Sequence, residues 1–103
     1  MTIICNMVGA HFRPQEAKDI IKSLEVGDVL TLRRDPENAY DNFAVACDYQ
    51  DEFLGFIPKE HNFEIATALD NGAEITAEIV AFANSLRPTL EIELPEEEDF
   101  EDD

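Results

Sequence analysis

Short stretches in which apolar and polar residues alternate set the strongest limit on the fold of this chain. Residues 29–34 (VLTLRR) and 75–82 (ITAEIVAF) alternate with the period of two that is typical of a half-buried β-strand. Four further strands are predicted from β-branched and apolar runs: residues 2–8 (TIICNMV), 43–49 (FAVACDY), 53–57 (FLGFI) and 87–94 (RPTLEIEL). Because 103 residues suffice for one compact domain but not for two, we expect a single domain.

Two segments between these strands have the spacing of short amphipathic helices. Residues 14–24 start with a proline that suits the first helical turn and repeat apolar side chains on one face. Residues 59–70 place Phe63, Ala66 and Leu69 on one face, and Asn71-Gly72 gives a C-terminal stop. The predicted order is β-α-β-β-β-α-β-β. We expect a mainly β, α+β fold, a small OB-like β-barrel of about six strands with two flanking helices, since closure removes free sheet edges.

Acidic residues are concentrated at the C-terminal end. The formal net charge is −17; residues 1–90 carry 15 Asp and Glu against 7 Lys and Arg, and residues 91–103 carry 9 acids and no base. The last residues contain too little apolar surface to offset the entropy of ordering them. We therefore predict a folded domain over residues 1–94 and a disordered acidic tail over residues 95–103.

The sequence gives little support for catalysis. It has no glycine-rich phosphate loop, GxSxG or HExxH motif, and its two cysteines and two histidines lack metal-ligand spacing. We predict a non-enzyme without metal or cofactor, in which Cys5 and Cys47 are reduced and buried. No apolar run reaches the length of a membrane span and no signal peptide is recognisable, so we expect a soluble cytoplasmic protein.

The most unusual run is RRDPENAYDNFAV, residues 33–45. It places two of the seven basic residues beside a turn rich in Asp, Pro and Asn. Reversal of the chain there delivers Tyr40 and Asp41 to the start of the next strand. Tyr40 offers a stacking face, and Asp41 accepts hydrogen bonds either from a ligand hydroxyl or from its own backbone, in which case it only braces the turn.

This turn, together with VGAHF (residues 8–12) and LGFIPKE (residues 54–60), resembles the HIRAN domain in order and spacing. The resemblance covers roughly residues 3–83. HIRAN domains occur at the front of helicase-like transcription factor and as free-standing bacterial and phage proteins.

The resemblance implies an OB-like barrel that captures the free 3′ end of single-stranded DNA. Aromatic rings would stack on bases, the turn aspartate would meet the 3′ hydroxyl, and basic residues would hold phosphates. The matching positions in this chain are His11, Phe12, Arg13, Arg34, Asn38, Tyr40, Asp41, Phe56 and Lys59.

Two features of the chain set expectations for this binding. Arg13 stands where the family often has a second aromatic, and Phe43 where it prefers an asparagine. Because the acidic chain repels DNA, binding would depend on a patch formed by Arg13, Arg33, Arg34 and Lys59, and should be weak and salt-sensitive.

Structural roles for the same residues stay open at this point. Phe12 and Phe56 could fill the core, and His11 could be an ordinary surface histidine. Arg33 and Arg34 could simply pair with Asp35 and Glu37. The alternative function is an acidic protein-interaction module or DNA mimic that docks on a DNA-processing enzyme, through the domain or through the tail with Phe100.

Overall fold

The computed structural model describes residues 1–95. Its elements are β1 (Thr2–Asn6), the 3-10 helix η1 (Ala10–Phe12), α1 (Gln15–Ser23), β2 (Val29–Arg34), β3 (Val45–Tyr49), β4 (Glu52–Phe56), α2 (Lys59–Asp70), β5 (Thr76–Ala81) and β6 (Thr89–Glu93). The predicted order of six strands and two helices is confirmed, with η1 as an addition. The predicted disorder of the tail concerns residues 96–103, which lie outside the described residues.

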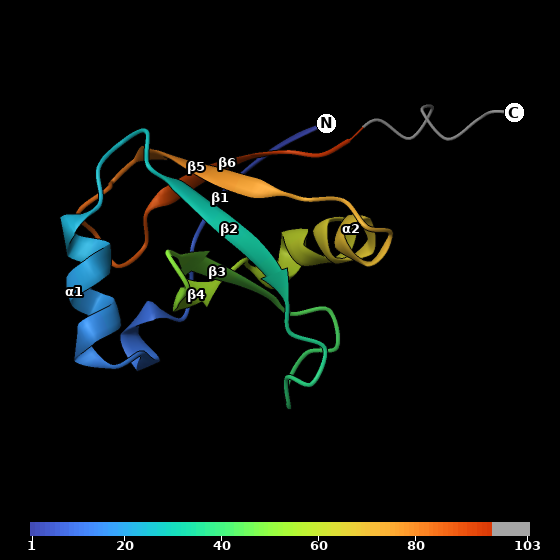
Figure 1. Ribbon diagram of the computed structural model, residues 1–103, viewed down its shortest axis with the longest axis horizontal. Coiled ribbons are helices and arrows are strands. Elements are labelled where there is room, and N and C mark those ends of the chain that lie inside the picture. The colour runs from blue at the N-terminus through green and yellow to red at the C-terminus, as the bar shows by residue number, and fades with distance from the viewer. Residues whose placement is uncertain (96–103) are drawn as a thin grey trace, which may run out of the picture.

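The six strands form one antiparallel sheet in the order β1-β6-β5-β2-β3-β4. The first and last strands are paired, with Ile3 opposite Ile92, and the termini of the described chain lie side by side in Figure 1. At the other end of β1 the chain reaches β4, where Val8 and Phe56 exchange two backbone hydrogen bonds of 2.9 and 2.8 Å. This bridge joins the two edges of the sheet at one point, and the predicted mainly β, α+β fold is confirmed.

The two helices lie at opposite ends of the sheet (Figure 1). Pro14 and Pro58 each directly precede a helix, where the missing N–H of proline does no harm. In α1 the predicted face is confirmed, with Ala17 and Ile21 buried. In α2 the prediction for Phe63 was wrong: its side chain is 56% exposed. The buried face is instead formed by Asn62, Ile65 and Ala66, because α2 packs on β2 and β3 through those positions.

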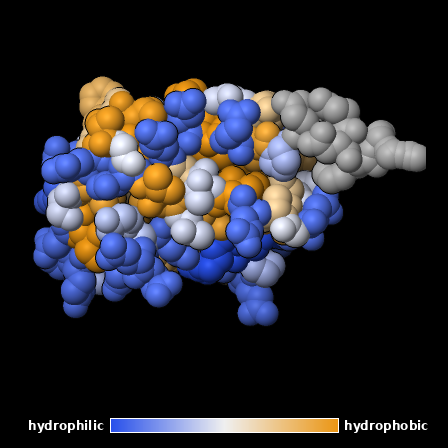
Figure 2. Space-filling model, turned by 45° about the horizontal axis from the view of Figure 1, so that its top comes forward, coloured by the Kyte–Doolittle hydropathy of each residue, from blue (hydrophilic) through white to orange (hydrophobic). Residues whose placement is uncertain are grey.

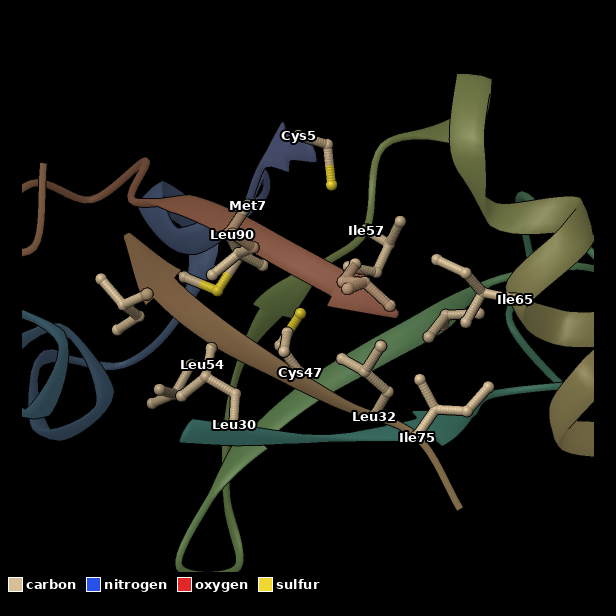
Figure 3. Close-up of a cluster of buried hydrophobic side chains, with 14 of the residues drawn as sticks. Cys5, Met7, Leu30, Leu32, Cys47, Leu54, Ile57, Ile65, Ile75 and Leu90 are labelled. Atoms are coloured by element: carbon tan, nitrogen blue, oxygen red, sulfur yellow. The ribbon is translucent and has the colours of Figure 1, made fainter. Parts of the chain in front are cut away.

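The core lies between the curved sheet and the two helices, with Ala17 and Ile21 of α1 and Ile65 of α2 among its buried residues. Figure 3 shows side chains from β1, β2, β3, β4 and α2 that point toward one another, among them Leu30, Leu54 and Ile65, each fully buried. Cys5 and Cys47 are buried free thiols, as predicted. Burial raises the pKa of Cys5 to about 11, with a smaller contribution from the nearby Glu60 carboxylate, and burial also raises the pKa of Cys47.

Gly55 in β4 is required by its neighbours. A Cβ atom at this position would lie 2.7 Å from the carbonyl oxygen of Val8 and 2.9 Å from Cγ of Met7. The absence of a side chain therefore allows the segment after β1 to approach β4 closely enough to form the Val8–Phe56 bridge.

None of the helices within residues 1–95 is long and apolar enough to cross a membrane.

Candidate nucleic-acid interface

Three segments of the predicted site meet at the end of β4. Phe56 is bridged to Val8 on one side and paired with Ala46 of β3 on the other. Gly9 follows the bridge with a φ of 84°, and a Cβ atom there would lie 3.2 Å from the Phe56 ring. The left-handed backbone at Gly9 lets the chain turn over this ring into η1. Phe56 is thus half-buried, and its ring packs against the backbone at Gly9, just before η1.

The short helix η1 places two of the predicted residues in water. Its Ala10 is buried and anchors the turn, whereas His11 and Phe12 are exposed. The Phe12 side chain is 90% exposed, which excludes the core role left open by the sequence. The Phe12 N–H donates to the carbonyl of Gly9 (3.2 Å), so the backbone under the ring is held while the ring is not covered.

Arg13, next in the chain, is held against Phe53 of β4. Its Nε donates to the Phe53 carbonyl (3.1 Å), and its guanidinium lies 4.0 Å from the centroid of the Phe53 ring. The guanidinium of Arg33 lies 5.6 Å from the same centroid. The Phe56 ring packs edge-on against the Phe53 ring, with 5.1 Å between the two ring centroids. Phe53 is therefore the centre of an aromatic–arginine cluster formed by Arg13, Arg33, Phe53 and Phe56. Phe53 was not among the predicted site residues, because its neighbours in the sequence are Glu52 and Leu54 and the two arginines reach it only in the folded chain.

Arg33 and Arg34, the last two residues of β2, form ion pairs with carboxylates outside the turn. Arg33 forms an ion pair with Asp48 (2.7 Å), and Arg34 forms one with Asp70 (2.9 Å) and also donates to the Ala44 carbonyl (3.2 Å). The pairing with Asp35 and Glu37 that the sequence left open is therefore not the one that forms. Across the β2–β3 ladder Thr31 lies opposite Asp48, which brings Arg33 within diagonal reach of that carboxylate, and α2 ends beside Arg34.

The turn itself, residues 35–44, projects beyond the ends of β2 and β3 (Figure 1). The Asn38 side chain organises it: its amide donates to Asp35 (3.2 Å) and its carbonyl oxygen accepts the Tyr40 N–H (2.8 Å). Tyr40 is 89% exposed. Asn38 therefore positions the backbone that carries Tyr40, while the ring stands in solvent.

Asp41 is braced from two sides. One carboxylate oxygen accepts the Phe43 N–H (2.9 Å), and the other accepts the side-chain amide of Asn62 in α2 (2.7 Å). The bond from Phe43 does most to hold the pKa of Asp41 below its usual value, and Asn62 and the nearby cations Lys59 and Arg34 add to the effect. The structure thus confirms the bracing role, and the carboxylate stays ionised at neutral pH.

Asn62 is a second residue that was not predicted from the sequence. It is 4% exposed and is the one buried polar side chain among residues 1–95. A buried amide needs partners, and Asp41 provides one. Nothing in the residues 59–70 pattern distinguished Asn62 from an exposed helical asparagine, because its partner lies 21 residues away in the turn.

The predicted residues therefore fall into two groups. One is the turn with Asn38, Tyr40 and Asp41, flanked by Arg34 and Lys59. The other is η1 with His11 and Phe12, next to the aromatic–arginine cluster. Both groups combine an exposed ring with nearby cations, an arrangement that can stack a planar base and attract a phosphate.

Comparisons with known proteins agree with this description. The sequence profile of the HIRAN domain matches residues 1–97. A crystal structure of a protein from Lactobacillus plantarum superposes with a TM-score of 0.77 at 22% identity, covering 89% of this chain and 93% of that one. The crystal structure of the HIRAN domain of human HLTF superposes with a TM-score of 0.73 at 22% identity, covering 88% and 72%. No curated protein sequence gives a significant match.

A profile match over nearly the whole chain, supported by the same fold in two solved structures, identifies the family. The chain belongs to the HIRAN domain family, whose members are binding domains generally linked to nucleic acids.

Proposed function

We propose that this domain binds the 3′ end of single-stranded DNA through the turn and η1. The observation that carries the proposal is the exposure of Phe12 and Tyr40, 90% and 89%, on backbone segments that hydrogen bonds hold in place. Rings presented in this way form a stacking platform worth about 1–3 kcal/mol per base, and they accept any base because every base has a π-face.

Asp41 is the residue that would recognise the end of the strand. Each of its two oxygens already accepts one protein hydrogen bond and keeps a lone pair for a second donor. A terminal 3′ hydroxyl can donate to it, whereas a terminal phosphate would place a second negative charge beside a carboxylate whose pKa is lowered. The braced carboxylate would therefore favour a hydroxyl end over a phosphorylated one.

Lys59 and Arg34, which are near enough to lower the pKa of Asp41, would hold the adjacent phosphates. Arg34 is shared with Asp70, and Arg13 is held on Phe53, so few cations are fully available. On a chain of net charge −17 this predicts weak binding that falls steeply with salt.

The test is a titration of fluorescent oligothymidylate ending in either a 3′ hydroxyl or a 3′ phosphate at low salt. The wild-type protein should prefer the hydroxyl end at least several-fold. Asp41→Asn keeps an oxygen for the Phe43 N–H but removes the charge, so it should lose most of that preference. Equal binding of both ends by the wild type, or an unchanged preference in Asp41→Asn, would leave Asp41 as a brace only.

A second candidate is a protein-interaction module for a basic partner, such as a DNA-processing enzyme. The observation in its favour is a row of carboxylates on the outer face of the sheet, where Glu78 of β5 lies directly opposite Glu91 of β6, with Glu93 beside them. Like charges placed opposite each other destabilise a sheet by about 0.2–1 kcal/mol, and a cationic partner would relieve that cost.

A further inference from the structure

Within residues 1–95, the backbone edge of β1 that faces away from β6 has no partner strand between Thr2 and Asn6. The Leu94 N–H donates to the Met1 carbonyl (2.8 Å) and the Met7 N–H donates to the Pro88 carbonyl (3.0 Å), so the odd-numbered residues direct their backbone groups toward β6. In an antiparallel pair the next residues direct theirs to the opposite side. Val8 follows this rule, because its outward groups bond to Phe56. The outward backbone groups of Thr2, Ile4 and Asn6 therefore point along the same edge.

No strand within residues 1–95 pairs with this edge. The sheet ends at β1, and the chain that follows Phe56 leaves the edge at Pro58 to form α2. Ile4, in the middle of the strand, is 54% exposed. Unpaired backbone groups on an exposed strand are a template for the addition of another strand.

Helix α2 lies alongside the same edge and leaves a groove. Near its start, Glu60 is close enough to Cys5 of β1 to contribute to the raised pKa of that thiol. Along its later turns a groove of about 520 Å³ separates the helix from the first residue of the chain and the end of β6. Phe63, Thr67 and Ala68 line it from the helix, and Leu94 and Pro95 from the strand side. The groove is mainly apolar and could accept a large side chain.

The surroundings of the groove are acidic. Glu64 lines it and Glu60 lies one turn earlier on α2, whereas Glu93 of β6 is paired with the N-terminal ammonium of Met1 (3.4 Å), a residue that also lines the groove. Within residues 1–95 no lysine or arginine lines it. Figure 2 shows apolar side chains set among hydrophilic ones on the face of the domain that it presents. Charge complementarity therefore selects a basic occupant.

We propose that an extended, basic segment of a partner protein pairs with the edge of β1 that faces away from β6 and inserts an apolar side chain into the groove beside Phe63. Five residues in a strand span about 17 Å, which suffices to follow β1 from Asn6 to Thr2. Main-chain hydrogen bonds would hold the segment, and its lysines or arginines would face Glu60 and Glu64. The inference rests on the second candidate function and is independent of nucleic-acid binding.

The probe for this site is a labelled seven-residue peptide with blocked ends that alternates lysine with valine and phenylalanine. Its control replaces the valines with proline, which keeps the charge but prevents strand pairing. The full-length protein should bind the first peptide with a Kd below about 1 mM at low salt and the second at least several-fold more weakly.

Two pairs of variants locate the binding. Ile4→Pro removes an outward N–H that β6 does not use and should weaken binding at least about tenfold, whereas Ile4→Thr, which keeps the N–H, should change it less than about twofold. Glu64→Lys should weaken binding about fivefold, and Glu16→Lys in α1, with the same change in net charge, less than about twofold. If Ile4→Pro does not fold, the Glu64 pair still decides.

Each other outcome overturns the proposal in a distinct way. No binding of either peptide would remove both the groove and the second candidate function. Binding that responds equally to the two lysine variants would keep an acidic interaction surface but reject the groove. A dimer in light scattering that Ile4→Pro dissociates would make a second copy the occupant. Truncation after Pro95 that shifts the NMR signals of Ile4 and Phe63 without peptide would make the occupant the chain's own C-terminal segment.

Discussion

Replacing Asn62 with alanine removes the amide that ties the turn to α2. A hydrogen bond to a charged acceptor contributes about 1.5–3 kcal/mol to folding. Asp41 is partly exposed, so water can replace the lost donor, and the small volume lost at a site that is 4% exposed adds a packing term. We expect Asn62→Ala to lower the free energy of unfolding by about 2 kcal/mol at pH 7, measured by urea denaturation followed by circular dichroism.

The loss should depend on pH. Because the folded pKa of Asp41 is lowered, its contribution to stability is fully present above the unfolded pKa of about 3.9 and is lost as the pH falls through the folded value. Asn62→Ala removes the side-chain hydrogen bond that helps to lower the pKa of Asp41. The difference in stability between the two proteins should therefore be largest near neutral pH and should shrink when the carboxylate is protonated.

A double-mutant cycle with Asp41→Ala separates the hydrogen bond from packing. A coupling energy of about 1–2 kcal/mol at pH 7 that declines in acid is the expected result. Asn62→Ala could instead lower the free energy of unfolding equally at pH 7 and in acid, or the effects of the two substitutions could be additive. Either result would mean that Asn62 acts by filling space, and it would refute the reasoning about the Asp41 brace.

Three further predictions concern the core and the exposed rings. Gly55→Ala should destabilise the fold by about 2–4 kcal/mol in urea, because its Cβ would meet the Val8 carbonyl at 2.7 Å; a loss under about 1 kcal/mol would show that the bridge yields easily. Above about pH 9 stability should fall by up to about 1.4 kcal/mol per pH unit for each thiol, since the unfolded chain ionises before Cys5, whose pKa is about 11 in the folded protein. In the double variant Cys5→Ala, Cys47→Ala the free energy of unfolding should fall less steeply above about pH 9. An equally steep fall would show that the buried thiols do not cause it. Phe12→Ala and Tyr40→Ala should each cut single-strand affinity about 5- to 100-fold and leave the urea midpoint within error, and a large loss of stability would mean that the rings are structural.

The sequence predicted the elements well because their signals are local. The alternation in residues 29–34 and the proline-led apolar spacing in residues 14–24 depend only on neighbouring residues, and both elements form as expected. The exception, Phe63, lies one position away from the true buried face of α2. A helix of twelve residues with apolar side chains on several sides does not determine by itself which side meets the sheet.

The partners of the polar side chains could not be predicted in the same way. The pairing of Arg33 with Asp48 depends on the register of β2 and β3, and that of Arg34 with Asp70 depends on where α2 ends in space. The role of Asn62 needs both the turn and the helix in place. The site residues themselves were named from the resemblance of the turn around Tyr40 and Asp41 to the HIRAN domain, and the profile match shows that family; the role of these residues in binding stays a prediction.

The pairing of the first strand with the last has a consequence for synthesis on the ribosome. Thr2 lies opposite Glu93, and β6 separates β1 from β5, so the sheet lacks a middle strand until nearly the whole chain has emerged. At about 5–20 residues per second, the nascent chain carries the apolar side chains of Ile3, Cys5 and Met7 without their partner strand for on the order of 5–20 s. The interval is long enough for chaperones to engage the N-terminal strand. A frameshift or deletion within β6 would therefore leave an unfolded chain for degradation rather than a domain trimmed at one edge.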